Sequence, residues 1–105
     1  AIFGINVIAG RLRQSYLLMK KDGDIIGRVK EMQDNGITLQ EAKKGDSVAI
    51  SVEDITFGRQ IKDDDILYTF INDANERLLR YKFSDMLSDE EKSVLDEISK
   101  IKAHK

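Results

Sequence analysis

Apolar and polar residues alternate along the first two-thirds of the chain with the two-residue period of half-buried strands. Residues 3–7 and 47–52 show this alternation most regularly, so both stretches are predicted to line one core. Together with four further runs, they give about six predicted strands. The further runs are residues 12–19, 25–32, 37–42 and 66–71.

Polar turns separate the predicted strands. Asp22-Gly23 and Asn35-Gly36 are dipeptides whose easy positive φ suits tight hairpin turns, which predicts antiparallel neighbours. Because closure removes exposed strand edges, a small closed or nearly closed antiparallel β-barrel is the predicted arrangement. Two further polar turns are predicted, at residues 44–46 and 63–65.

After Ile71 the apolar period changes to that of a helix. Asn72 or Asp73 can cap a first helix, with Glu76 three residues after Asp73. The apolar residues of this predicted helix recur at roughly helical spacing. They are Leu78, Leu79, Phe83, Met86 and Leu87.

A capping box at Ser88 and Glu91 predicts a second helix of about 15 residues. An apolar stripe on one face of this helix must be buried on the barrel, on the first helix or on a partner. The predicted fold class is therefore mainly β with C-terminal α, with a barrel over residues 1–71 and a two-helix extension over residues 72–105 in one domain. The stripe consists of Val94, Leu95, Ile98 and Ile101.

Composition narrows the possible classes of function. The 105 residues, 41% of them hydrophobic, suffice for one compact domain and exclude most multi-domain enzymes. Cys is absent and His104 is the single His, which excludes disulfides, thiolate catalysis and zinc sites built on Cys or paired His. No apolar run approaches the ~20 residues of a membrane span and no signal peptide is present, so we expect a cytoplasmic protein without membrane contact. Because the chain opens on strand-like sequence without Met, we expect a fragment of something longer.

The net charge of −2 hides an uneven distribution. Residues 1–30 hold six basic and two acidic residues, residues 31–65 hold four and nine, and residues 66–105 hold seven and eight. The basic excess is therefore confined to the N-terminal third. Affinity for phosphate depends on clustered Lys and Arg, so any contact with nucleic acid must be local.

Motifs for catalysis are missing from the sequence. No Gly-rich phosphate-binding loop occurs, so no nucleotide site is encoded. The acidic run at residues 63–65 lacks the spaced ligands of a calcium loop, and we interpret it as a solvated turn. His104 has no second ligand or base near it in sequence, and we interpret it as an exposed tail residue. We expect no catalytic residue and no metal site in this chain.

The order of short motifs along the chain carries more information than the patterns alone. These motifs resemble the C-terminal domain, domain IV, of archaeal and eukaryotic translation initiation factor five B, the counterpart of bacterial initiation factor two. Ser15 and Leu17 depart from this resemblance, because they stand where Gly and Pro are expected, and Asp64 stands where a turn Gly is usual. The motifs are Phe3-Gly4, Gly10-Arg11-x-Arg13, Tyr16-x-Leu18-Met19, Gly27-x-Val29, Glu41-Ala42-x-x-Gly45-Asp46-x-Val48-Ala49-Ile50-Ser51, Gly58-Arg59-x-Ile61, Asp65-x-Leu67-Tyr68, Leu87-Ser88-Asp89-Glu90-Glu91 and Val94-Leu95-x-Glu97-Ile98.

The resemblance implies a β-barrel like the second domain of the elongation-factor GTPases, extended by two helices. It also implies a parent protein that is a ribosome-dependent GTPase, promotes subunit joining and stabilises methionylated initiator tRNA. The GTP and Mg site would lie in a separate N-terminal domain. This chain is therefore expected to be a monomeric binding domain with no cofactor and no enzymatic activity of its own.

A first binding surface is implied on the barrel, which in the resembling family faces the acceptor end of initiator tRNA. Arginine suits phosphate because its fork donates two hydrogen bonds at once. Ordinary solvated charge is the open alternative for each candidate, although Arg11 and Arg59 each lie beside a Gly that lets a backbone approach closely. The candidates are Arg11, Arg13, Arg28, Lys43, Lys44 and Arg59.

A second surface is implied on the helices, which in the family hold the acidic, hydrophobic C-terminal tail of initiation factor one A. Such a tail needs an apolar groove and nearby cations. For each apolar candidate the open alternative is a place in the core between helices and barrel. The candidates are Arg77, Leu79, Arg80, Lys82, Phe83, Leu95, Ile98 and Lys102, with further apolar area from Leu78, Tyr81, Met86, Leu87 and Ile101 and further charge from Lys100.

An interpretation outside this family also remains open. Without the resemblance, the same patterns indicate a β-barrel that serves in protein–protein interaction or as a spacer, with no RNA contact. An enzyme is less well supported, because the sequence offers no set of polar groups that would converge in a pocket.

Overall fold

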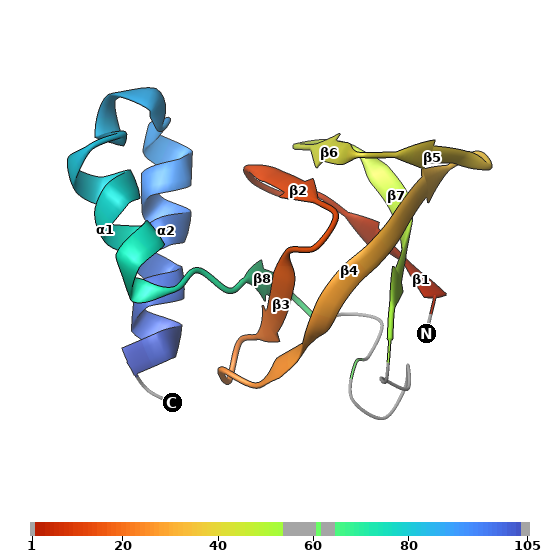
Figure 1. The fold of residues 1–105 in the computed structure, drawn as a ribbon, viewed down its shortest axis with the longest axis horizontal. Coiled ribbons are helices and arrows are strands. Elements are labelled where there is room, and N and C mark those ends of the chain that lie inside the picture. The colour runs from red at the N-terminus through yellow and green to blue at the C-terminus, as the bar shows by residue number, and fades with distance from the viewer. Residues whose placement is uncertain (1, 54–60, 62–64, 104–105) are drawn as a thin grey trace.

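The computed structural model of the chain describes residues 2–53, 61 and 65–103. Strands occupy the N-terminal part and helices the C-terminal part, in the predicted order (Figure 1). The elements are β1 (Ile2–Asn6), β2 (Arg11–Arg13), β3 (Leu17–Lys20), β4 (Ile25–Asp34), β5 (Ile37–Leu39), β6 (Glu41–Lys43), β7 (Ser47–Val52), β8 (Leu67–Thr69), α1 (Asp73–Tyr81), the 3₁₀ turn η1 (Ser84–Met86) and α2 (Asp89–Ala103).

The described strands form two antiparallel sheets. The larger has the order β1-β7-β4-β3-β8, with β5 also paired to β4, and the smaller is a ribbon of β2 and β6. The strand ladders of the described residues do not close into one continuous ring, but the two sheets wrap around one core. A mainly β fold followed by two C-terminal helices is therefore confirmed.

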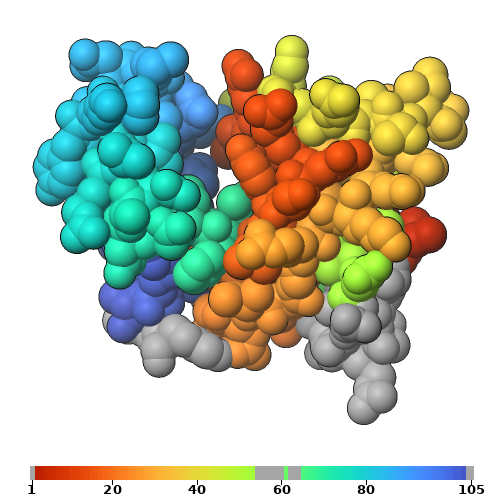
Figure 2. Space-filling model, viewed as in Figure 1, coloured from red at the N-terminus to blue at the C-terminus, as the bar shows by residue number. Residues whose placement is uncertain are grey.

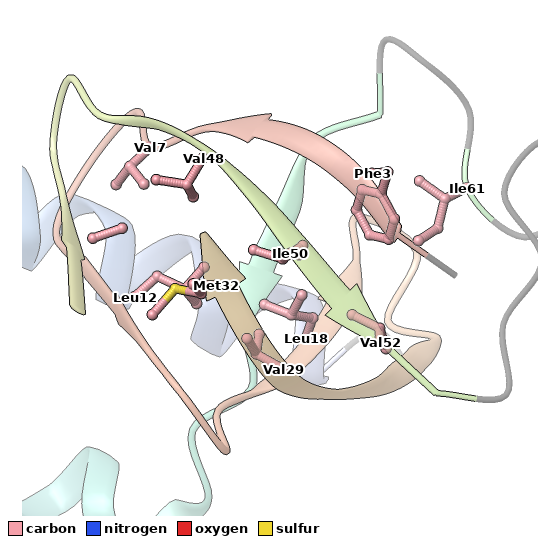
Figure 3. Close-up of a cluster of buried hydrophobic side chains, with 11 residues drawn as sticks. Phe3, Val7, Leu12, Leu18, Val29, Met32, Val48, Ile50, Val52 and Ile61 are labelled. Carbon is pink, nitrogen blue, oxygen red and sulfur yellow. The ribbon is translucent and has the colours of Figure 1, made fainter. Parts of the chain in front are cut away.

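The core consists of apolar side chains from both sheets (Figure 3). Strand β7 shows why the alternating pattern was informative, because Val48, Ile50 and Val52 are buried while the residues between them are more exposed. Burial of such a side chain contributes about 1.5–3 kcal/mol. The cluster comprises Phe3, Val7, Leu12, Leu18, Val29, Met32, Ala42, Val48, Ile50, Val52 and Ile61.

One strand was predicted over residues 12–19, but the structure divides it into β2 and β3. Ser15 lies between them with φ 74°, the left-handed region that side chains rarely adopt. The Ser15 N–H donates to the Val29 carbonyl at 2.8 Å, and the Val29 N–H donates to the Tyr16 carbonyl at 2.9 Å. Ser15 and Tyr16 thus lie opposite the single residue Val29, which is the arrangement of a β-bulge. A bulge bends the strand that carries it.

The single strand predicted over residues 37–42 is also divided, at Gln40. The part before Gln40, β5, pairs with β4, whereas the part after it, β6, pairs with β2 in the other sheet. The prediction was wrong because the chain changes sheets at this corner, and tertiary pairing leaves no mark on the local apolar pattern.

The predicted hairpin turns are present. Asn35 and Gly36 both have positive φ, 51° and 80°, as a two-residue hairpin turn with matching twist requires. Asp22 and Gly23 connect β3 to β4, with the Asp22 carboxylate accepting from the Asp24 N–H at 2.9 Å. Gly45 likewise has positive φ, 93°, in the turn between β6 and β7.

Helix α1 begins as predicted and ends earlier than predicted. The Asn72 side chain caps it by accepting from the Asn75 N–H at 2.8 Å. The last turn closes at Leu78, whose carbonyl accepts from the N–H groups of both Lys82 and Phe83. Phe83 therefore lies beyond the end of the helix, and the chain continues into η1.

Helix α2 begins at the predicted capping box. The Ser88 N–H donates to the Glu91 carboxylate and the Glu91 N–H donates to the Ser88 hydroxyl, each at 3.1 Å. The two helices lie side by side at one end of the molecule, and β8 is the strand that leads into them (Figure 1). None of the helices within the described ranges has the length and apolar character needed to cross a membrane.

Candidate binding surfaces

The β2–β6 ribbon carries a basic outer face. Arg11 lies opposite Lys43 and Arg13 lies opposite Glu41 in the antiparallel register. Opposite partners and second neighbours share a face of a sheet, so these four side chains project together. The intervening pair, Leu12 and Ala42, is buried in the core and fixes the ribbon in place. We call Arg11, Arg13, Glu41 and Lys43 the basic ribbon.

Two of the three cations of the basic ribbon share one carboxylate. Glu41 lies 3.2 Å from Arg11 Nη1 and 3.8 Å from Arg13 Nε, and both arginine side chains are more than half exposed. Arg11 faces Lys43, and like charges in opposite positions destabilise a strand pair. Exposed ion pairs are worth only about 0–1 kcal/mol, so the donors can exchange Glu41 for an external anion.

The other cations predicted for this surface lie apart from the ribbon. Arg28, on β4, donates from Nη1 to the Ser15 carbonyl at 2.9 Å, so its head is fixed at the bulge. Lys44 lies in the turn after β6 and pairs with Glu90 of α2 at 2.8 Å, which ties that turn to the helices. Arg59 lies outside the described residues.

Five charged side chains join α1 to α2, and we call them the ion cluster. Arg80 pairs with Glu76 at 3.3 Å and with Asp96 of α2 at 2.9 Å. Lys102 of α2 pairs with Asp73 at 2.7 Å and with Glu76 at 3.2 Å. Arg80 and Lys102 were both candidates for binding a partner's tail, but they are already engaged by carboxylates of the helices.

Proton affinities in the ion cluster follow from this pairing. Burial raises the pKa of the Glu76 carboxyl, but Lys102 and Arg80 outweigh burial and hold that pKa below its usual value. The hydrogen bond from Lys102 lowers the pKa of Asp73. Burial lowers the pKa of Lys102, yet Asp73 and Glu76 together raise it above its ordinary value. All three groups are therefore charged at neutral pH.

Lys102 also joins α2 to the segment between β8 and α1. Its Nζ donates to the Ile71 carbonyl at 2.7 Å and lies 5.8 Å from the centre of the Phe70 ring. With Asp73 and Glu76, this bond uses the three donors of the ammonium group. A second link joins β8 to α2, because the Tyr68 hydroxyl donates to the Glu97 carboxylate at 2.9 Å.

The apolar candidates on the helices divide into core and surface. Leu95 and Ile98 are 4% and 3% exposed, so they belong to the packing of α2, the alternative weighed for them. Leu79 is half-buried, and Phe83 is 38% exposed. The helical pattern alone did not separate these cases, because burial depends on where the helices meet the sheets.

A shallow hollow on α1 is lined by exposed residues of that helix and its C-terminal end. Leu78 and Tyr81 supply its apolar area, and Arg77 and Lys82 supply positive charge. Lys82 Nζ also lies 5.6 Å from the centre of the Phe83 ring. We call this surface the α1 face, lined by Ala74, Arg77, Leu78, Tyr81 and Lys82.

A wider cleft of about 800 Å³ lies between the β3–β4 hairpin and the helices. Met19 and Phe70 form part of its apolar wall, and the ion cluster supplies Asp73, Glu76 and Lys102. These charges neutralise one another, which leaves the cleft without a free charged group from that set. Residues 2–53, 61 and 65–103 contain no group of three His, Asp or Glu side chains placed to hold a metal ion. Residues 63, 64 and 104 lie outside the described residues.

Figure 2 shows the face on which the segment leading from β2 into β3 lies between the helices and the β4–β5 hairpin. This segment carries the bulge at Ser15 and Tyr16. No local pattern predicted that Arg28 would be fixed there, because its partner is a backbone carbonyl thirteen positions away.

Comparison with known proteins gives consistent similarities. Residues 1–68 match the family described as elongation factor Tu domain 4. The chain is 41% identical to the probable translation initiation factor IF-2 of Methanopyrus kandleri and 44% identical to that of Staphylothermus marinus. Each alignment covers 97% of this chain but only 17% of the relative.

A solved structure is similar over the same extent. The GDP-bound aIF5B from Aeropyrum pernix matches with a TM-score of 0.93 and 35% sequence identity. The alignment covers 97% of this chain and 17% of that one. The chain thus spans about one-sixth of the length of the proteins that it resembles.

Proposed function

Because this chain belongs to the elongation factor Tu domain 4 family, in the form found as domain IV of IF-2/aIF5B translation initiation factors, we propose that it binds the acceptor end of methionylated initiator tRNA on the ribosome. We propose further that it docks the C-terminal tail of initiation factor one A and so supports the joining of ribosomal subunits. The chain is a factor domain and not the GTPase domain of such a factor.

The basic ribbon is the observation that carries the RNA proposal. It concentrates three exposed cations against one carboxylate in a chain whose net charge is −2. Arg11 and Arg13 can each offer two parallel donors to a phosphate, and Lys43 adds a point charge beside them. Gly10, before Arg11, has φ 71° and open space where a Cβ would stand, so the approach to Arg11 is unobstructed on that side.

The α1 face supports the proposal for the partner's tail. An acidic, hydrophobic segment needs apolar contacts for its aliphatic side chains and cations for its carboxylates. Leu78 and Tyr81 offer the former, and Arg77 and Lys82 offer the latter. The ion cluster is a poorer candidate, because Arg80 and Lys102 would have to leave existing partners.

The remaining parts of the proposal concern the longer factor. Hydrolysis of GTP, with its Mg, belongs to another domain, and this chain contributes binding as a monomer without a cofactor. The factor works in the cytoplasm, where the ribosome is its platform.

An affinity measurement with an aminoacylated acceptor-stem RNA tests the RNA proposal. The double variant Arg11→Glu, Lys43→Glu reverses two charges of the basic ribbon, and Lys21→Glu, Lys92→Glu makes the same change at exposed positions elsewhere. We expect the first variant to bind at least tenfold more weakly and to lower the salt dependence of binding by about two counterions. Equal loss in both variants, or none in the first, would contradict the assignment.

A protein-binding or spacer module without RNA contact is the second candidate. The exposed apolar residues of the α1 face favour protein binding. Titration with the acidic tail peptide distinguishes the two functions: Tyr81→Asp should abolish peptide binding and leave RNA binding unchanged. If the basic-ribbon variants bind RNA like the unmodified chain while Tyr81→Asp loses the peptide, the second candidate is correct.

A further inference from the structure

An exposed aromatic side chain stands at the bulge that divides β2 from β3. Tyr16 is 37% exposed, although the residues that follow it in β3 turn into the protein. Its backbone is fixed on both sides: its N–H donates to the Arg13 carbonyl at 3.4 Å, and its carbonyl accepts from the Val29 N–H at 2.9 Å. Val29 is 1% exposed and belongs to the core, so Tyr16 sits on a rigid support.

The bulge beneath Tyr16 carries a conformational cost. Ser15 adopts φ 74°, a region that costs an L-residue energy and that Gly occupies freely. Bulges are frequent at the rims of barrels and beside binding sites, where they redirect a side chain. An observed backbone outlier of this kind is a reason to look for a function at the residue that it redirects.

Two cationic residues adjoin the backbone at Tyr16. Arg28 donates from Nη1 to the Ser15 carbonyl at 2.9 Å, which fixes its guanidinium one residue from Tyr16. Arg13 lies at the other end of the same turn, and its exposed side chain belongs to the basic ribbon. Arg13 of the basic ribbon thus precedes the bulge, and the head of Arg28 is fixed on it.

We propose that Tyr16 is a stacking platform for an unpaired base at the 3′ end of the acceptor strand, with Arg13 and Arg28 holding the adjoining phosphates. The inference rests on the proposed function and adds to it the contact with a base. Proteins that hold single-stranded ends combine cations along the backbone with aromatic rings on which bases stack. A tyrosine fixed on rigid backbone loses little conformational freedom when the base arrives.

The experiment compares two acceptor-stem RNAs, one with the unpaired 3′ end and one blunt. The variants are Tyr16→Phe, which keeps the aromatic face, and Tyr16→Leu, which keeps apolar packing without that face. We expect Tyr16→Phe to bind the RNA with the unpaired end like the unmodified chain, and Tyr16→Leu to bind it about tenfold or more weakly. The blunt RNA should bind equally to all three proteins.

Two further readouts separate stacking from a structural role. A fluorescent 2-aminopurine at the 3′-terminal position should be quenched on binding to the unmodified chain and to Tyr16→Phe, but not to Tyr16→Leu. The salt dependence should be the same in both Tyr16 variants, because no charge is removed, whereas Arg28→Gln should lower it by about one counterion.

The outcomes distinguish this inference from the proposed function. If Tyr16→Leu binds both RNAs like the unmodified chain, while reversal of Arg11 and Lys43 weakens binding, the stacking role is refuted and the RNA function stands. If Tyr16→Leu weakens binding of the blunt RNA as much as the other, its role is structural and the proposal fails. If the unmodified chain binds neither RNA, both proposals are refuted.

Discussion

The sheets of this chain share an apolar core, whereas a set of ion pairs connects the two helices to each other. Eleven buried apolar residues form the core cluster, most of them on strands of the two sheets. Helix α1 has no fully buried residue, and Arg80 and Lys102 connect it to α2. Hydrophobic burial involves no group that titrates, whereas ion pairs depend on pH and are screened by salt. The two regions should therefore respond differently to the same perturbation.

The largest expected effect is the loss of a core side chain. Ile50 of β7 lies opposite Phe3 on one side and Met32 on the other and is 1% exposed. We expect Ile50→Ala to lower the free energy of unfolding, measured in urea, by about 2–5 kcal/mol. Ile37→Ala makes the same change at a side chain that is 66% exposed, and it should cost less than about 0.5 kcal/mol. Equal costs would contradict the core described here.

Removal of the Lys102 ammonium should loosen the helices and leave the sheets intact. In Lys102→Met, Asp73 and Glu76 lose their shared partner and Ile71 loses its donor. Because the Lys102 side chain is 15% exposed, we expect a loss of about 1–3 kcal/mol of stability in this region. Hydrogen exchange should speed up over α1 and α2 but not over β4 and β7.

Lys100→Met is the matched control for that variant, since Lys100 lies in the same last turn but is exposed. It should leave exchange in both regions unchanged. Faster exchange throughout the chain in Lys102→Met would mean that helices and sheets unfold as one unit, which would contradict the contrast drawn here.

A pH series should separate the two regions without mutation. The pKa values of Asp73 and Glu76 are lowered in the folded chain, so the stability that they contribute is present above their ordinary pKa near 4 and is lost as the pH falls through the folded values. The pKa of Lys102 is raised, so its contribution is lost as the pH rises through that value above 10.5. NMR spectra between about pH 6 and pH 2 should show the helices lose order before the sheets. Simultaneous loss would refute the prediction.

The smallest effect concerns the bulge. Ser15→Gly should raise stability by up to about 1 kcal/mol, because Gly adopts φ 74° without the penalty of a side chain. The same substitution at Ser93, exposed in α2, should lower stability by about 0.5 kcal/mol. Thermal or urea denaturation measures both changes. The same substitution should raise stability at Ser15 and lower it at Ser93.

Local signals predicted those parts of the fold that local chemistry determines. The turn at Asn35-Gly36 and the capping box at Ser88 and Glu91 each depend on neighbouring residues, and both predictions are confirmed. The alternation over residues 47–52 correctly identified core residues. The division at Gln40 was missed, because it depends on pairing between sheets. The early end of α1 was also missed.

Contacts between residues distant in the sequence also limited the prediction of the candidate binding residues. Lys102 resembled a free cation in the sequence, because its partners Asp73 and Glu76 lie on the other helix. Arg80 has one partner four positions away, Glu76, but its shorter contact, to Asp96, also crosses to the other helix. The resemblance to the factor family, which the comparisons confirm, supplied what the pattern could not. The individual RNA and tail contacts stay predictions, and Arg59 among them lies outside the described residues.

The most direct test of the central claim is an NMR titration of the isotopically labelled chain with the aminoacylated acceptor-stem RNA. The account predicts saturable chemical-shift changes confined to β2, β6 and the bulge at Ser15 and Tyr16, with the helices unaffected. Changes confined to α1 and α2, or no change with the fold intact, would contradict the assignment of the basic ribbon as the RNA-binding surface.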